Sequence, residues 1–190
     1  MREPIREDNR LARLPTWGPS FRVSFSLLIT SFDGDNLFKG KWAELLRFTN
    51  TDNNCCRMGD RIPAIFTNKN GFIQVATQNG QSGNKWTNVP METRTWYQLE
   101  LLQYNLYDKV ASIYLLVLWW YLPTFQFFSE IKLDGESIGR IENENPRQFR
   151  NVGVWAAKTQ NNFPPAKAFI GNLEYGNLGV CVHKIINMKV

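Results

Sequence analysis

FRVSFSLLIT, residues 21–30, alternates apolar and polar side chains, with Leu28 as the one exception. The apolar side chains take every second position: Phe21, Val23, Phe25, Leu27 and Ile29. A period of two residues is typical of a β-strand that buries one face and leaves the other to solvent. Because such a strand must cover its apolar face, we expect a second layer of structure to pack against it.

Shorter runs of the same kind follow along the chain, separated by turn-rich stretches such as TNKNG, LDGE and ENENP. No stretch outside residues 107–136 shows the sustained 3.6-residue apolar period of a helix, so helices should be few and short. Many short strands at a spacing of about ten residues predict an all-β fold, a two-sheet antiparallel jelly-roll sandwich. The expected strands lie at residues 42–49, 64–67, 72–77, 95–104, 127–133, 137–142, 151–157 and 168–175.

The Asp134-Gly135 pair predicts a tight hairpin turn. A two-residue type I′ turn needs positive φ at both central positions, and Asp-Gly adopts it at low cost. We therefore expect FFSEIKL and ESIGRIE, on either side of the pair, to form antiparallel neighbours.

Size and charge limit the possible functions. With 190 residues the chain is long enough for one domain with a substantial core. The net charge is +5, but the Lys and Arg residues are scattered singly among acids and never form a run of five. Nucleic-acid-binding proteins concentrate their cations, so we expect no nucleic-acid partner. Weak attraction to acidic polysaccharide stays open.

An uncharged run, residues 110–128, separates Lys109 from Glu130. It nearly reaches the length of a transmembrane helix, but a span here would place the two halves of the sheet on opposite sides of a bilayer, so we expect none. A long hairpin or packed flap is a second possibility. Our leading interpretation is a retained intron or gene-model error over 110–126, because Val can be encoded with a leading GT and Phe-Gln as TTTCAG.

Removing residues 110–126 makes the strand pattern regular. Two strands are then joined by a short polar turn and followed by the Asp134-Gly135 hairpin. Phe127, Ser129, Ile131 and Leu133 fall on one face of the second strand, and Phe128, Glu130 and Lys132 fall on the other.

Three stretches carry a family resemblance: LPTWGPSFRVSFSLLITSF, WAELLRFTNTDNNCCRMGDRIPAIFTNKNGFIQVATQNGQSGNKW, and WYQLELLQY with FSEIKLDGESIGRIENENPRQFRNVGVWAA. They resemble the laminin-G-like, concanavalin A-like lectin/glucanase domains of extracellular proteins of marine invertebrates. The resemblance implies a jelly roll over residues 14–176, with the atypical apolar insert at 110–126. Residues 1–13 would be a polar leader, and 177–190 a tail without an assigned role.

The resemblance also implies a secreted or cell-surface location. Residues 1–15 hold no apolar stretch of a secretory signal, so we expect a truncated gene model. The expected function is a non-enzymatic extracellular recognition or cell-adhesion module that binds glycan or protein through loops at one end of the sandwich. The alternatives are an inactive or divergent glycan-active enzyme, and a surface protein anchored in the membrane by 110–128.

A candidate sugar site lies in QNGQSGNKWTN, residues 78–88. Trp86 could stack on the apolar side of a pyranose, while Gln81, Asn84 and Lys85 bond its hydroxyls. The alternative is that the indole only covers a sheet edge.

A candidate calcium site lies in TNTDNNCCRMGDR, residues 49–61. Asp52, Asn53 and Asp60 could supply the oxygen ligands that Ca²⁺ prefers. The alternative is that Asp and Asn serve only as turn formers, with Gly59-Asp60 closing a turn. We expect no other cofactor.

The remaining chemistry-bearing residues favour no reaction. Glucanases of the family carry E-x-D-x-E on one strand, whereas Glu130, Asp134 and Glu136 here have a different spacing and a turn among them. His183 and Cys181 lie near the end of the chain without a third catalytic group, and Cys55, Cys56 and Cys181 are an odd number without metal-ligand spacing. We expect Trp17, Trp42, Trp96 and Trp155 to pack in the core.

Overall fold

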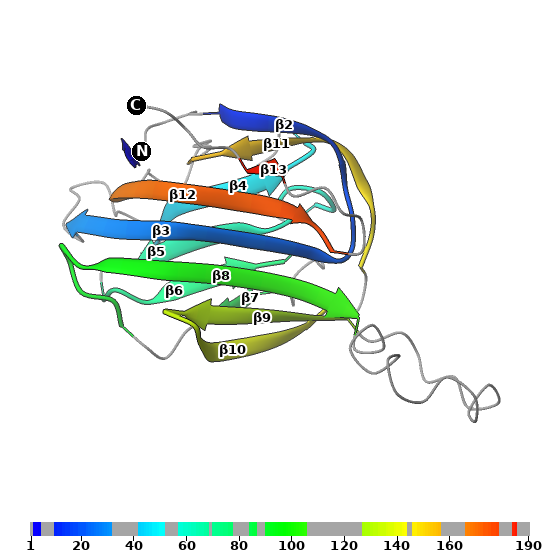
Figure 1. Ribbon diagram of the computed structural model, residues 1–190. Coiled ribbons are helices and arrows are strands. Elements are labelled where there is room, and N and C mark those ends of the chain that lie inside the picture. Colours follow the sequence, from blue (N-terminus) through cyan, green and yellow to red (C-terminus); the bar gives the residue numbers. More distant parts are fainter. Residues whose placement is uncertain are drawn as a thin grey trace, which may run out of the picture.

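The computed structural model describes residues 2–4, 10–31, 42–51, 57–68, 70–77, 84–86, 90–105, 127–143, 146–156, 166–178 and 184–185. Within these residues the protein consists of strands and connecting turns without a helix. The strands form two antiparallel sheets that stack face to face, as Figure 1 shows. The predicted all-β jelly-roll sandwich is therefore confirmed.

One sheet has seven strands in the order β1-β12-β3-β8-β9-β10, with β13 also paired to β12. It faces the viewer in Figure 1. Its strands are β1 (Arg2–Pro4), β3 (Phe21–Ser31), β8 (Trp96–Asn105), β9 (Phe127–Leu133), β10 (Glu136–Asn143), β12 (Lys167–Asn177) and β13 (Lys184–Ile185).

The other sheet has six strands in the order β2-β11-β4-β5-β6-β7 and lies behind the first. Its strands are β2 (Arg10–Trp17), β4 (Trp42–Thr49), β5 (Ala64–Asn68), β6 (Ile73–Ala76), β7 (Asn84–Trp86) and β11 (Phe149–Trp155).

The core lies between the two sheets and follows the alternation seen in the sequence. Val23, Phe25, Leu27 and Ile29 of β3 are fully buried, whereas Arg22 and Thr30 reach the outer face. The opposite sheet contributes side chains such as Leu45, Phe48, Val75 and Val154, which are also fully buried. Strands such as β3, β9 and β11 bury one face only, whereas β4, β5 and β6 are buried on both faces.

The strands on either side of the apolar insert pair as expected. β8 and β9 are antiparallel neighbours, with Asn105 opposite Phe127. Ser129, Ile131 and Leu133 are buried, whereas Glu130 and Lys132 are partly exposed, so the predicted faces of β9 are confirmed. Residues 110–126 lie outside the described part of the chain, and the retained-intron hypothesis stays a prediction. No helix in the described ranges has the length and apolarity needed to cross a membrane.

The β9–β10 connection is the predicted type I′ turn. Asp134 has φ 50° and Gly135 has φ 88°, positive at both central positions. The register continues from Glu136 opposite Leu133, and one irregularity follows between Ser137 and Gly139.

Four strands fall where the sequence pattern predicted none. β2 begins at Arg10, so the expected boundary at Leu14 falls inside a strand. β1 and β13, which lie in the expected leader and tail, both pair with the edge of β12. β7 lies in the expected loop 78–88 and pairs with β6. Short strands and strands rich in charge lack the apolar alternation that carried the other predictions.

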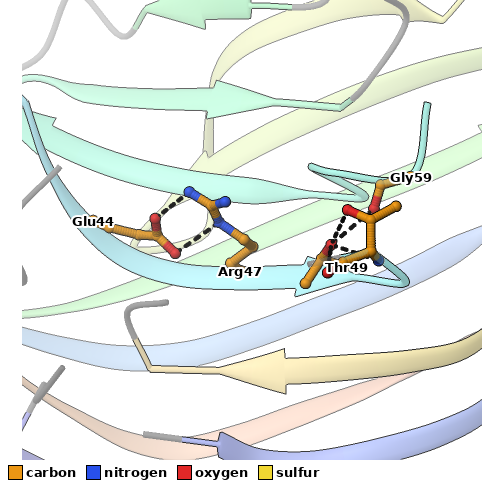
Figure 2. Close-up of polar contacts among 5 residues, drawn as sticks. Glu44, Arg47, Thr49 and Gly59 are labelled. Carbon is orange, nitrogen blue, oxygen red and sulfur yellow. Dashed lines mark hydrogen bonds and ion pairs between the residues drawn. The ribbon is translucent and has the colours of Figure 1, made fainter. Parts of the chain in front are cut away.

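A fully buried ion pair lies on β4. The Arg47 guanidinium donates from Nε to Glu44 Oε1 at 2.8 Å and also binds Glu44 Oε2, so the contact is bidentate (Figure 2). Both side chains have no exposed surface. Arg47 and Arg61 also lie near the Phe66 ring, at 6.0 and 5.2 Å from its centroid. Such a pair fixes the geometry of β4, because neither charge can lose its partner without a large desolvation cost.

Candidate functional site

The outer face of the seven-stranded sheet is arranged in rows that cross its strands. Pairing of β3 with β8 sets Leu28 opposite Trp96, Ser26 opposite Gln98, and Ser24 opposite Glu100. Because residues in register share a face, each pair starts a row of similar chemistry. The first row is apolar, the second carries amides and hydroxyls, and the third is charged.

A hollow of about 420 Å³ lies on this face, over β12, β3 and β8. Its volume falls in the range of small-molecule sites in proteins, about 300–1,000 Å³. Its lining residues are Ser26, Trp96, Tyr97, Gln98, Asp134, Gly171 and Asn172.

Hydrogen bonds hold the polar floor of this hollow in place. Ser26 Oγ donates to Gln98 Oε1 at 3.0 Å and accepts from Asn172 Nδ2 at 3.1 Å. Gln98 Nε2 in turn donates to Ser24 Oγ at 2.7 Å. Each of these groups keeps further hydrogen-bonding capacity, since an amide oxygen has two lone pairs and an amide nitrogen two protons. The floor is therefore an ordered set of neutral donors and acceptors.

Asp134 ties the hairpin turn to this floor. Its carboxylate Oδ1 accepts from the backbone N–H of Gln98 at 2.7 Å, and its own N–H donates to the carbonyl of Gln98 at 2.8 Å. The turn that the sequence predicted thus has a second role, because it fixes one wall of the hollow beside Gln98.

Trp96 forms the aromatic wall. Among the described residues it is the one large hydrophobic side chain that is exposed, at 36%. The prediction that it packs in the core is wrong, because Trp96 shares its face with Gln98 and Glu100 rather than with buried Leu99. An indole face beside ordered amides matches a sugar ring, which has an apolar side and a rim of hydroxyls.

The other three tryptophans that the sequence placed in the core, Trp17, Trp42 and Trp155, differ in burial. Trp17 is 2% exposed and packs against Phe21 and Phe48, as predicted. Trp42 and Trp155 are only partly buried, and Trp42 packs against a small cluster that includes Phe66.

The charged row continues the face away from the hollow. Arg22 binds Glu100 and lies 3.5 Å from Glu174, and Lys132 lies 3.8 Å from Glu100. Cations and carboxylates thus neutralise one another next to the hollow. The site is suited to an uncharged ligand.

The residues of the sugar site expected from sequence belong to the other sheet or lie outside the described residues. Asn84, Lys85 and Trp86 form β7 rather than a loop, at the edge of the six-stranded sheet. The structure describes their backbone only, and Gln81 lies outside the described residues. Sequence reasoning missed Trp96, although its register with Gln98 and Glu100 in WYQLE was a usable signal of an outward position.

Of the three expected calcium ligands, the described structure includes Asp60 alone. Asp52 and Asn53 lie outside it. Asp60 is fully buried, and its carboxylate accepts from the Arg57 backbone N–H at 2.8 Å and from Thr51 Oγ1. Thr49 Oγ1 donates to the carbonyl of Gly59 at 3.0 Å and closes the same turn (Figure 2). These contacts favour the turn-forming alternative for Asp60, and the described residues hold no cluster of potential metal ligands.

The structure places two of the carboxylates considered in the sequence. Glu130 lies opposite Arg140 on the outer face, and Asp134 is engaged in the turn. Cys55, Cys56, Cys181 and His183 lie outside the described residues, so their roles stay predictions.

A second cavity, of about 620 Å³, opens where β2 turns into β3. Trp17 and Tyr175 line it, and their Nε1 and Oη atoms are buried without a hydrogen-bond partner in the described structure. Burial raises the pKa of Tyr175 to about 12. The aromatic cluster leaves these two polar atoms unsatisfied.

Comparison with known proteins shows the fold. A heptameric SAP-like pentraxin from Limulus polyphemus is 10% identical, with a TM-score of 0.56 over 92% of this chain and 74% of the pentraxin. A putative carbohydrate-binding protein from Bacteroides ovatus is 10% identical, with a TM-score of 0.52 over 99% of this chain and 50% of that chain. The botulinum neurotoxin type G receptor-binding domain, also 10% identical, reaches 0.51 over 83% of this chain and 34% of its own.

These likenesses are consistent with the two-sheet jelly-roll fold of the chain. No protein-family model and no curated protein sequence matches it. At this level of identity the likeness is one of fold, and function must be argued from the site.

Proposed function

We propose that this protein is a non-enzymatic, extracellular recognition module that binds a neutral glycan on the outer face of its seven-stranded sheet. The observation that carries the proposal is the exposed Trp96 beside the hydrogen-bonded row Gln98, Ser26 and Asn172. The likeness in fold to a putative carbohydrate-binding protein from Bacteroides ovatus supports it.

The expected pose follows from the geometry. A pyranose would lay its apolar side on the Trp96 indole and turn its hydroxyls toward the amides of Gln98 and Asn172. Rigid amides held by Ser24 and Ser26 need little ordering on binding, so less affinity is lost to entropy. The adjacent ion pairs of Glu100 with Arg22 and Lys132 would disfavour a charged sugar, whose charge they would have to accommodate.

The absence of catalysis is part of the proposal. Glycoside hydrolysis needs two carboxyl groups that flank the bond to be cleaved. The carboxylate that lines the hollow, Asp134, already accepts a hydrogen bond from the Gln98 backbone and supports a turn. This arrangement favours binding over reaction.

The test is a glycan array with the intact protein and single variants. We expect binding to one class of neutral glycan, and Trp96→Ala to weaken it by about thirtyfold, which corresponds to about 2 kcal/mol for an aromatic anchor. Trp96→Phe should retain part of the affinity because it keeps an aromatic face.

The control is Trp86→Ala, which removes the tryptophan at the sequence-predicted site. Thermal melting of both variants would show that each is folded. Equal binding by Trp96→Ala and the parent protein, or loss with Trp86→Ala alone, would overturn the proposed site.

A further inference from the structure

The two sheets differ strongly in charge. The strands of the seven-stranded sheet carry six cations and six acids, whereas those of the six-stranded sheet carry five cations and one acid. That single acid is Glu44, which is fully buried and paired with Arg47. The sequence conceals this asymmetry, because its cations are scattered singly and only the sheet brings them together.

The register places three arginines on one outer surface. Val152 and Val154 of β11 are fully buried, so the intervening Gly153 and its partner Arg13 face outward. Arg150 is exposed, follows the core-packed Phe149 and lies opposite the exposed Thr16, and Trp155 lies opposite Arg10. Arg10, Arg13 and Arg150 are all exposed, and none forms an ion pair with another described residue.

These three arginines form a stripe along the paired strands β2 and β11. Each step spans three residues of extended chain, about 10 Å, so the stripe is about 20 Å long. We call Arg10, Arg13, Arg150 and the adjacent Trp155 the arginine stripe. The spacing of its charges is comparable with the length of a disaccharide unit.

Trp155 adds an aromatic face to the stripe. A Cβ atom at Gly153 would lie 2.5 Å from Trp155 Nε1, so the indole rests close on the glycine backbone. The Arg10 guanidinium lies 5.7 Å from the centre of the indole, within the range of a cation–π contact. The glycine thus lets the ring lie flat along the sheet, beside the cations.

We propose that the arginine stripe binds a linear acidic polysaccharide, with sulfate or carboxylate groups on the arginines and a sugar ring against Trp155. Guanidinium groups suit this role because they bind planar or tetrahedral anions through two parallel hydrogen bonds. The stripe is a single row, which fits one chain better than the two backbones of a nucleic-acid duplex. A membrane surface would also need exposed apolar groups, and the exposed Trp96 lies on the opposite sheet.

The site is separate from the proposed neutral-glycan hollow. It stands on a different sheet, uses different residues and depends on charge. Failure of one proposal therefore leaves the other intact.

The experiment measures the affinity of the full chain for a heparin oligosaccharide as a function of salt. Arg13→Ser together with Arg150→Ser should weaken binding by about thirtyfold at physiological salt, because each cation at a polyanionic surface contributes about fivefold. The slope of log affinity against log salt should fall by about two, since each cation that meets an anion releases about one counterion.

The matched control is Arg140→Ser with Lys167→Ser, which removes two exposed cations from the seven-stranded sheet. This pair lowers the net charge by the same amount as Arg13→Ser with Arg150→Ser. It should leave at least a third of the parent protein's affinity for heparin. A conservative pair, Arg13→Lys with Arg150→Lys, should keep the salt slope while losing part of the affinity. Trp96→Ala should leave heparin binding unchanged.

Three results would overturn the proposal. Equal weakening by the two serine pairs would mean attraction by net charge alone. Tighter binding of a DNA duplex, or of phosphatidylserine vesicles, than of heparin at the same salt would assign the stripe to another class of partner. Lack of heparin binding by the parent protein at low salt would remove the site altogether.

Discussion

At the scale of single residues, the buried pair Glu44–Arg47 should dominate the stability of β4. Arg47→Met removes the bidentate guanidinium partner of the buried Glu44 carboxylate. We expect this substitution to lower the free energy of unfolding by about 3–5 kcal/mol. Glu100→Gln breaks partly exposed ion pairs with Arg22 and Lys132 and should cost about 1 kcal/mol or less. Chemical denaturation measures both. Equal losses would show that burial does not set the strength of these pairs.

Tyr175 gives a pH-dependent prediction at the same scale. Its hydroxyl is buried without a hydrogen-bond partner among the described residues, so Tyr175→Phe should not destabilise the protein at pH 7. Because burial raises the pKa of Tyr175 from 10.0 to about 12, the unfolded chain loses this proton first. The contribution of protonated Tyr175 to the free energy of unfolding is fully present below pH 10 and should be lost between pH 10 and 12. Denaturation curves across this range should show a shallower fall for Tyr175→Phe, and identical slopes would contradict the assignment.

At the scale of elements, two glycines test how turns are encoded. Gly135 and Gly59 have similar positive φ, 88° and 94°, but different surroundings. A Cβ at Gly135 meets nothing within 4 Å, whereas one at Gly59 would lie 1.9 Å from Asn50 Oδ1. Gly135→Ala should therefore cost only the backbone strain, about 1–2 kcal/mol, and Gly59→Ala should cost more. Thermal melting of the two variants checks the order, and a smaller loss at Gly59 would contradict it.

Elements with strong alternation were predictable from sequence, and others were not. β3 and β9 follow a period of two that one buried face imposes. β2, RLARLPTW, is rich in charge and contains Pro15, a combination that an edge strand tolerates but a pattern search passes over. β1 and β13 are too short to show a period, and only pairing with β12 makes them strands.

At the scale of the whole molecule, the fold followed from the sequence and the site did not. Trp96 was expected in the core because tryptophan generally prefers cores. It lies on the outer face because it alternates in phase with Gln98 and Glu100 along β8. The hollow joins Ser26, Trp96 and Asn172, which are far apart along the chain, and the register of β12 with β3 and β8 brings them together. The arginine stripe likewise depends on the pairing of β2 with β11. The strand periods could be predicted locally, whereas these juxtapositions arise only from the order of strands in each sheet.

The central claim is that a neutral glycan binds beside Trp96, and amide-resolved NMR tests it most directly. The titration uses ¹⁵N-labelled protein and the neutral glycan that the array selects. We predict that the indole N–H of Trp96 and the side-chain amides of Gln98 and Asn172 shift together along one binding isotherm. Shifts confined to β7 or to the loops beside it, with these three groups unmoved, would contradict the account.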